Sequence, residues 1–233
     1  FQAAMNALNP VMTVRRQIVE PMLFHRTEPN LAAANRRAEE LFELVGLPRG
    51  RLDSYPHELS GGMRQRAVMA MSLACKPDLL IADEPTTALD MVVQDQIFQR
   101  LNAIRDALGL TLILVSHDIG LIAENCDDIA VMYGGRMVER GPARQVLTNP
   151  RHPYSTVLVR ATPSLASQDA LISLPGGAPD LSKPIAGCIF AHRCPRFEEA
   201  CAARDPDFVD FANGQSARCL FAETVKPEDV LAR

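Results

Sequence analysis

Two short apolar runs, each followed by polar residues, constrain this chain more than any other feature. Residues 79–82 are apolar and are followed by Asp83 and Glu84, while residues 111–115 are mostly apolar and are followed by Ser116 and His117. Short runs that are apolar on both faces are typical of buried parallel strands. We therefore predict an α/β domain with a mainly parallel sheet, whose ligands lie at the carboxyl ends of the strands.

Helical patterns surround these two runs. Residues 30–45 place apolar side chains on one helical face, and a second helix should begin near Gly62 and end before Pro77. Between the two runs, apolar residues recur at helical spacing and predict a third helix. Asp90 is placed to cap its start, and Gly109 is placed to end it.

The sequence changes character after the second apolar run. Residues 129–133 and 136–139 predict two short strands joined by a Gly-Gly turn. Beyond residue 150, prolines recur too often for long helices or strands. We therefore predict two domains, residues 1–149 and residues 150–233, of which the second is irregular.

A glycine-led helix start is the first candidate site. Residues 59–66 read Leu-Ser-Gly-Gly-Met-Arg-Gln-Arg. A helix entered through Gly61 and Gly62 presents unpaired amide N–H groups and a positive dipole end to a phosphate, and the Ser60 hydroxyl adds a donor. We include Gln65, on the same turn, among the candidate nucleotide-binding residues. By itself the motif is also explained as a helix cap without a ligand.

The polar residues that follow the two runs are the second candidate site. A carboxylate that closes a buried strand is costly unless it binds something, so Asp83 is expected to hold Mg²⁺ directly or through water. Glu84 is placed to orient and polarise an attacking water, and His117 to touch a γ-phosphate. The alternatives are a carboxylate pair that only caps the strand and a histidine with a structural hydrogen bond.

Together these segments resemble the ABC ATPases. Residues 59–66 resemble the signature motif, residues 79–85 the Walker B strand and residues 85–90 the D-loop, and His117 resembles the switch-loop histidine. The resemblance implies a partial P-loop NTPase-like domain with a helical subdomain at about residues 10–76, and with ATP and Mg²⁺ as ligands. It also implies that Gln2 is the Q-loop glutamine and that Asp90 makes a contact across a dimer interface as well as a helix cap.

The phosphate-binding loop of this family, Walker A, does not occur in the sequence. Such a loop needs Gly-x-x-x-x-Gly-Lys followed by Ser or Thr, and none of the lysines, Lys76, Lys183 and Lys226, follows a glycine. Because the family places this loop upstream of the Q-loop, we expect it to precede Phe1 in a longer gene product. The chain alone is therefore expected to be inactive as an ATPase, although its signature surface could complete an ATP site in a partner subunit.

Four cysteines mark the second predicted domain. Cys188, Cys194, Cys201 and Cys219, together with the Pro-Arg-His-Pro-Tyr-Ser sequence of residues 150–155, resemble the C-terminal extension of oligopeptide and dipeptide importer ATPases. That resemblance implies an iron–sulfur cluster, [4Fe–4S], in some members. Four neighbouring thiolates satisfy a tetrahedral Zn²⁺ equally well, and plain reduced thiols are the third alternative.

Composition argues against two classes of protein. With 24 Lys and Arg against 28 Asp and Glu, and a net charge of -4, the chain lacks an overall basic field that would hold nucleic acid. No apolar run approaches the roughly 20 residues of a membrane-spanning helix, and the start of the sequence lacks a signal-peptide pattern. We therefore expect a cytosolic protein, and the resemblance to importer ATPases implies that it lies on the cytoplasmic face of the cell membrane as a peripheral subunit.

The leading hypothesis is an ATPase subunit that energises the import of di- or oligopeptides. It would pair with a second ABC ATPase subunit, as a homodimer or heterodimer, and with two transmembrane permease subunits. The permease subunits would receive peptide from an extracytoplasmic binding protein. Two alternatives stay open: a non-transport ABC scaffold, and a regulatory fragment that pairs with an intact ATPase. The sequence leaves the substrate open among dipeptides, oligopeptides, glutathione and nickel chelates.

Overall fold

The chain divides into two compact units, residues 1–117 and residues 118–233. The computed structural model describes residues 7–87, 89–161 and 176–225. In these ranges, none of the helices is both long and apolar enough to cross a membrane. The division between the units precedes the predicted domain boundary near residue 150, which stays a prediction.

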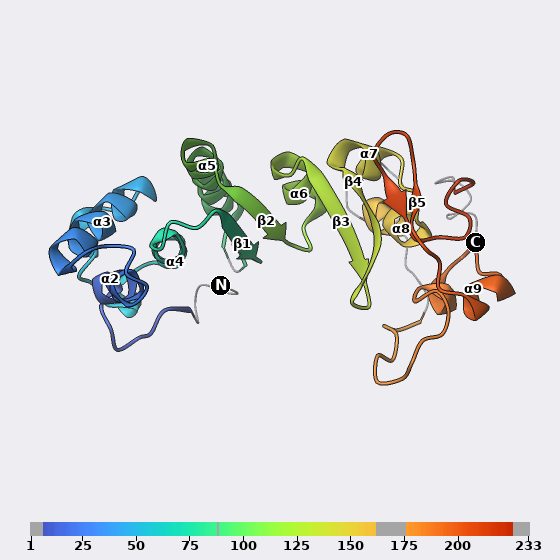
Figure 1. Cartoon of the computed structure of the whole chain (residues 1–233), viewed down its shortest axis with the longest axis horizontal. Coiled ribbons are helices and arrows are strands. Elements are labelled where there is room, and N and C mark those ends of the chain that lie inside the picture. The colour runs from blue at the N-terminus through green and yellow to red at the C-terminus, as the bar shows by residue number, and fades with distance from the viewer. Residues whose placement is uncertain (1–6, 88, 162–175, 226–233) are drawn as a thin grey trace. The chain divides into compact units, whose positions relative to one another are not determined.

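Three helices build the first part of the N-terminal unit (Figure 1). They are α2 (Val14–Phe24), α3 (Leu31–Leu44) and α4 (Gly61–Leu73), with the short 3₁₀ turns η1 (Arg49–Arg51) and η2 (Pro56–Glu58) between α3 and α4. The helix predicted at residues 30–45 is confirmed as α3, whose N-cap Asn30 accepts the Ala33 N–H at 2.9 Å. Its buried face consists of Ala34, Ala38, Leu41 and Phe42.

Helix α2 was not predicted. Pro21 lies inside it and removes one backbone donor, which obscures the helical pattern in the sequence. The helix forms nevertheless, because one of its faces is buried. It contacts both α3 and α4. The buried side chains of α2 are Val14, Gln17, Ile18, Val19 and Met22. Burial of this face outweighs the unfavourable local preference of one residue.

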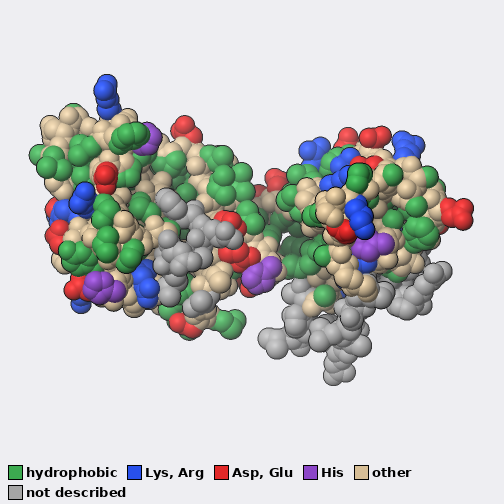
Figure 2. Space-filling model, turned by 90° about the horizontal axis from the view of Figure 1, so that it is seen from below, with side chains coloured by type: hydrophobic (Ala, Val, Ile, Leu, Met, Phe, Trp, Pro, Cys, Tyr) green, Lys and Arg blue, Asp and Glu red, His purple; other side chains and the backbone are tan. Residues whose placement is uncertain are grey.

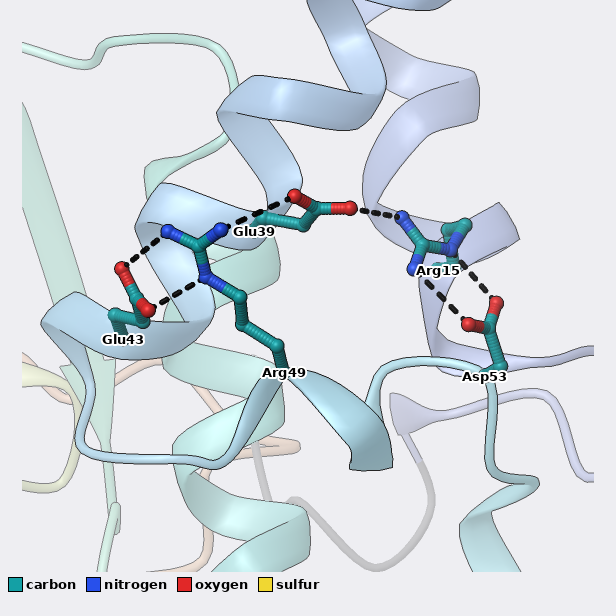
Figure 3. Close-up of polar contacts among 5 residues, drawn as sticks. All are labelled: Arg15, Glu39, Glu43, Arg49 and Asp53. Atoms are coloured by element: carbon teal, nitrogen blue, oxygen red, sulfur yellow. Dashed lines mark hydrogen bonds and ion pairs between the residues drawn. The ribbon is translucent and has the colours of Figure 1, made fainter.

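Charged side chains lie among apolar and uncharged ones on the face drawn in Figure 2. Figure 3 shows a chain of ion pairs that joins α2, α3 and the segment after α3. Arg15 donates from Nε to Asp53 Oδ1 at 2.6 Å and from Nη1 to Glu39 Oε1 at 3.2 Å, and Arg49 bridges Glu39 and Glu43. The hydrogen bond from Arg15 lowers the pKa of Asp53. Exposed pairs of this kind each contribute about 0.2–1 kcal/mol, so the apolar core supplies most of the stability.

The two predicted strands pair in parallel in the second part of this unit. The prediction that both are buried is wrong, because in the described residues their sheet has only these two strands. The exposed apolar side chains are Leu79, Ile81, Ile113 and Val115. β1 (Leu79–Asp83) and β2 (Thr111–Val115) run side by side, with Leu79 opposite Thr111 and Asp83 opposite Val115. Helix α5 (Met91–Leu108) connects them, and the predicted cap is confirmed because the Asp90 side chain accepts the Val93 N–H at 3.0 Å. Gly109 ends the helix in the left-handed region, with φ 64. Both strands therefore end at the same edge of the sheet.

The C-terminal unit is built on an antiparallel hairpin. Helix α6 (Ile119–Asn125) precedes β3 (Asp128–Tyr133) and β4 (Arg136–Pro142), and the predicted turn is confirmed at Gly134 and Gly135, whose φ angles are 54 and 77. β4 also pairs with β6 (Ser216–Ala217), which pairs with β5 (Val209–Asp210), both antiparallel. Among the described strands, the prediction of a mainly parallel sheet is therefore correct only for β1 and β2. The other strands pair antiparallel, and β3 and β4 must do so because a two-residue turn joins them.

Helices and irregular segments cover this hairpin. α7 (Ala143–Thr148) contacts β3, β4 and α8 (Pro153–Arg160). The chain then continues through η3 (Ala191–Arg193) and α9 (Glu199–Ala203) with the short elements expected of a proline-rich region. One apolar cluster contains Tyr133, Val138, Ile189 and Phe190, and a second contains Val157, Ala217, Cys219, Ala222 and Val225.

Candidate functional site

Glu84 and His117 meet at the carboxyl edge of the parallel strands. Glu84 Oε1 lies 2.6 Å from His117 Nδ1 and accepts the main-chain N–H of His117 at 3.0 Å. The two residues are 33 positions apart in the sequence, and they meet because the register pairs Asp83 with Val115. The structure thus brings these two predicted residues together, while their chemical roles stay predictions.

The backbone of Glu84 is held in an uncommon conformation. Its φ is 47, in the left-handed region that a residue with a Cβ seldom adopts, and its N–H donates to Val115 O at 2.9 Å. Such conformations cost about 1–3 kcal/mol and cluster at functional sites. The Glu84 side chain is 27% exposed and that of His117 is 85% exposed, so both can be reached from solvent.

Sequence reasoning missed Thr87 as a neighbour of this pair. The Thr87 hydroxyl donates to the main-chain O of Glu84 at 3.2 Å and lies 3.4 Å from Glu84 Oε2. His117 therefore contacts one carboxylate oxygen of Glu84 and Thr87 approaches the other. The signal that could have found Thr87 is its hydroxyl three residues after an acid, a spacing at which Ser and Thr bond back to the chain.

Asp83 is the last residue of β1 and is partly buried. Within the described ranges, its carboxylate forms no hydrogen bond with another residue. Its place directly before Glu84 puts two carboxylates at one strand end. This arrangement has the oxygen ligands that Mg²⁺ prefers.

The glycine-led helix start forms at α4. Ser60 is the N-cap and its hydroxyl accepts the Met63 N–H at 3.4 Å. A Cβ added at Gly62 would lie 2.8 Å from Val93 Cγ1 of α5, whereas one at Gly61 would lie 3.4 Å from Leu89 Cδ2. Close packing against α5 therefore explains Gly62 without a ligand.

The remaining candidates of the nucleotide site have different positions. Gln65 is buried on the first turns of α4, and Asp90 is engaged as the cap of α5. Gln2 lies outside the described residues. The structure therefore provides the local geometry of Gln65 and Asp90 but tests no contact of either residue with a nucleotide.

The four cysteines line one cavity in the C-terminal unit. Its volume is about 10 Å³, roughly the space that one water molecule needs, and its walls also include His152 and Phe190. The Cys188 N–H donates to Cys201 O at 2.8 Å. A Cβ at Gly187 would lie 2.3 Å from that same oxygen, so a glycine is needed for the two segments to approach. The lining cysteines are Cys188, Cys194, Cys201 and Cys219.

Burial disfavours the thiolate form at three of the four cysteines that line this cavity. Burial raises the pKa of Cys188, and raises the pKa of Cys194 to about 12 and of Cys219 to about 11. In the described part of the chain, no three His, Cys, Asp or Glu side chains are close enough together to hold a metal ion. The residues match the donor chemistry of a cluster or zinc site, but their packing does not form a metal centre.

Family patterns match two separate parts of the chain. The pattern of the ABC transporter family matches residues 1–87, and that of the oligopeptide/dipeptide transporter C-terminal region matches residues 138–201. Among solved structures, an ATP-binding cassette in a dimeric post-hydrolysis state, bound to ADP and phosphate, is similar with a TM-score of 0.54 and 29% identity, over 62% of this chain and 61% of that one. The part of the chain that aligns therefore has the fold of an ABC ATPase cassette.

Curated relatives are similar over nearly the whole chain. The dipeptide transport ATP-binding protein DppD of Escherichia coli strain K12 is 43% identical over 224 residues, which cover 95% of this chain and 68% of the relative. A peptide import ATP-binding protein of Brucella melitensis biotype 1 is 44% identical over 229 residues, which cover 94% of this chain and 68% of the relative. The chain thus spans about two thirds of the length of these relatives. It belongs to the ATP-binding subunits of the oligopeptide/dipeptide family of ABC transporters.

Proposed function

We propose that this chain belongs to an ATPase subunit whose ATP hydrolysis drives the import of di- or oligopeptides across the cytoplasmic membrane. The observation that carries the proposal is the contact between Glu84 and His117 at the shared end of β1 and β2. An acid and an imidazole in contact at the carboxyl edge of parallel strands occupy the place where α/β sheets bind ligands. The names of the relatives point to peptides as the transported class.

In this proposal each residue of the pair has a separate role. Glu84 accepts a proton from, or orients, the water that attacks the γ-phosphate, and His117 contacts the phosphate itself. His117 now occupies Oε1 of Glu84, so the water would be held at Oε2, beside the Thr87 hydroxyl. Asp83 would hold Mg²⁺, which supplies positive charge to the phosphates when bound.

The signature segment acts on a second subunit. Ser60, Gly61, Gly62 and Gln65 would complete the ATP site of a partner ATPase subunit, in a homodimer or heterodimer, with Asp90 contacting the partner. The first N–H groups of α4 lack partners within the helix and so suit this phosphate-binding role. Gln2 would connect the site to two permease subunits, which receive peptide from an extracytoplasmic binding protein. The subunit would thus lie on the cytoplasmic face of the membrane.

The 233-residue chain by itself is proposed to bind ATP poorly, because its sequence contains no Gly-x-x-x-x-Gly-Lys pattern to cradle the phosphates. Co-purification separates the leading proposal from the two alternatives. Recovery with permease subunits supports import, recovery with soluble enzymes supports a non-transport scaffold, and recovery only with an intact ATPase supports a regulatory fragment.

The test of the catalytic assignment is ATP hydrolysis by the full-length subunit. Glu84→Gln keeps the size of the side chain and removes the base, so we expect hydrolysis to fall about a hundredfold or more while ATP binding is retained. Glu223→Gln, at an exposed acid of the C-terminal unit, is the matched control and should hydrolyse ATP at the wild-type rate. Equal hydrolysis by Glu84→Gln and wild type would refute the role of Glu84.

We propose that the four cysteines bind a soft metal centre, which is a [4Fe–4S] cluster or alternatively Zn²⁺. The support is that four thiols line one cavity, the number of donors that either ligand needs. Because burial raises the pKa of three of these thiols, binding must also displace their protons. Binding requires the closed cavity to open. The full-length subunit, purified without oxygen, should carry iron and sulfide with absorbance at about 400 nm, or else zinc. Cys194→Ser should lose this metal and Cys75→Ser should keep it, whereas a metal-free wild type would leave reduced thiols as the answer.

A further inference from the structure

Glu139 is a buried carboxylate that the nucleotide site does not use. It lies on β4 and is 0% exposed. Its Oε1 accepts the Arg151 N–H at 2.7 Å, and its Oε2 accepts the His152 N–H at 3.0 Å. A third donor, Gln215 Nε2, lies 3.4 Å from Oε1. Because burial of a carboxylate is costly unless hydrogen bonds satisfy its oxygens, these donors determine whether Glu139 can occupy the position.

The second donor, His152, belongs to the wall of the four-cysteine cavity, and Arg151 directly precedes it. His152 and Pro153 line the cavity directly. His152 is 1% exposed, and its ring centroid lies 5.8 Å from that of Phe190, another lining residue. By fixing the N–H groups of Arg151 and His152, Glu139 fixes the point at which this wall begins. The chain cannot shift there without leaving the buried N–H of His152 and the partly buried N–H of Arg151 unpaired.

The third donor leads to another segment of the lining. Gln215 is 1% exposed and precedes β6, in which Ala217 pairs with Glu139 itself. Cys219 follows two positions after Ala217 and lines the cavity. The amide of Gln215 is fully engaged, because Nε2 also donates to Asn149 O at 3.0 Å and Oε1 accepts from Asn213 Nδ2 at 2.7 Å.

We propose that Glu139 is a positioning residue for the four-cysteine cavity. One carboxylate holds two segments of the lining, the wall at His152 and the strand that leads to Cys219. These segments are far apart in the sequence, since Glu139 and Gln215 are separated by 76 positions. The inference builds on the cysteine site proposed above but not on the identity of its ligand. It concerns how the thiols are placed and shielded before any ligand arrives.

Thiol labelling of the full-length subunit tests this role. The protein is freed of metal with a chelator, and the rate of N-ethylmaleimide labelling of each cysteine is measured by peptide mass spectrometry. Glu139→Gln replaces one acceptor oxygen with an NH₂ group that faces N–H donors, so labelling of the buried Cys201 and Cys219 should become roughly tenfold to hundredfold faster. Labelling of Cys126, in the same unit but outside the cavity lining, should not change.

Two further variants complete the test. Gln215→Met removes only the third donor, and should speed the labelling of Cys219 more than that of Cys201. If Glu139→Gln cannot be purified in a folded form, this variant tests whether Glu139 positions the cavity. Glu124→Gln, at an exposed acid of the same unit, should label like wild type.

Two results would overturn the proposal. One is wild-type labelling of Cys201 and Cys219 in Glu139→Gln. The other is a parallel acceleration at Cys126, which would mean that Glu139 supports the whole unit rather than the cavity. Because the assay uses no ATP, peptide or metal, its outcome is independent of the proposed transport function.

Discussion

At Gly62, helix α4 packs closely against helix α5. A Cβ added there would lie 2.8 Å from Val93 Cγ1, closer than two carbon atoms approach without a shift, whereas a Cβ at Gly61 would meet Leu89 Cδ2 at an acceptable 3.4 Å. Both glycines lie in the first turn of α4. The substitutions Gly62→Ala and Gly61→Ala therefore change the same helix end by the same methyl group but differ in the room available for it.

The expected difference in stability follows from two opposing terms. Alanine in place of glycine favours a helix by up to about 1 kcal/mol. A methyl group forced into a packed contact costs about 1–3 kcal/mol. We therefore expect Gly61→Ala to be neutral or to stabilise the N-terminal unit by up to about 1 kcal/mol, and Gly62→Ala to be less stable than Gly61→Ala by about 1–3 kcal/mol.

Urea unfolding followed by circular dichroism measures this difference. The added substitution Val93→Ala removes the atom that the new methyl group would meet, so the double variant Gly62→Ala/Val93→Ala should be more stable than the sum of the two single changes predicts. If Gly62→Ala is at least as stable as Gly61→Ala, the explanation of Gly62 by helix packing is wrong.

Four other predictions concern the two units. His117→Ala should lower ATP hydrolysis by the full-length subunit about a hundredfold, measured by phosphate release, because Glu84 loses its 2.6 Å contact; an unchanged rate would contradict this. Gly187→Ala should destabilise the C-terminal unit by about 3 kcal/mol in thermal unfolding, since its Cβ would lie 2.3 Å from a main-chain oxygen, and a wild-type midpoint would be inconsistent with that packing. Burial lowers the pKa of His152 to about 3, so below its ordinary value of 6.5 the unfolded chain binds a proton that the folded chain does not; stability should therefore fall as pH drops from 6.5 towards 3, and His152→Asn should flatten this dependence in urea unfolding at a series of pH values. Arg15→Gln should cost about 0.2–1 kcal/mol at low salt and nothing measurable at about 1 M salt, where exposed ion pairs are screened.

The parts of the fold with strong periodicity could be predicted from the sequence. The parallel strands β1 and β2, the cap at Asp90 and the face of α3 depend on local patterns, and each forms as expected. The predicted burial of the two strands was wrong, because an apolar run shows which side chains could be buried and not whether other elements cover them. Helix α2 was missed because Pro21 interrupts its pattern, and its formation depends on tertiary burial. β5 and β6 have two residues each, too few to show an alternation, and they exist only because β4 offers an edge for pairing.

The candidate site was predictable to the extent that topology places residues together. Glu84 and His117 could be expected to meet because each follows a parallel strand, and parallel strands end at one edge. The approach of Thr87 and the left-handed φ of Glu84 depend on the path of the chain after the strand, which no periodicity encodes. The hydrogen bonds of Glu139 join segments far apart in the sequence, so only the folded structure reveals them.

Peptide uptake by the complete assembly tests the central claim most directly. The full-length subunit, its permease subunits and a peptide-loaded binding protein are reconstituted in vesicles, and both labelled dipeptide uptake and phosphate release are measured. The account predicts uptake that requires ATP and that stops, together with hydrolysis, in Glu84→Gln. ATP hydrolysis or uptake at the wild-type rate in that variant, or uptake that proceeds without ATP, would contradict it.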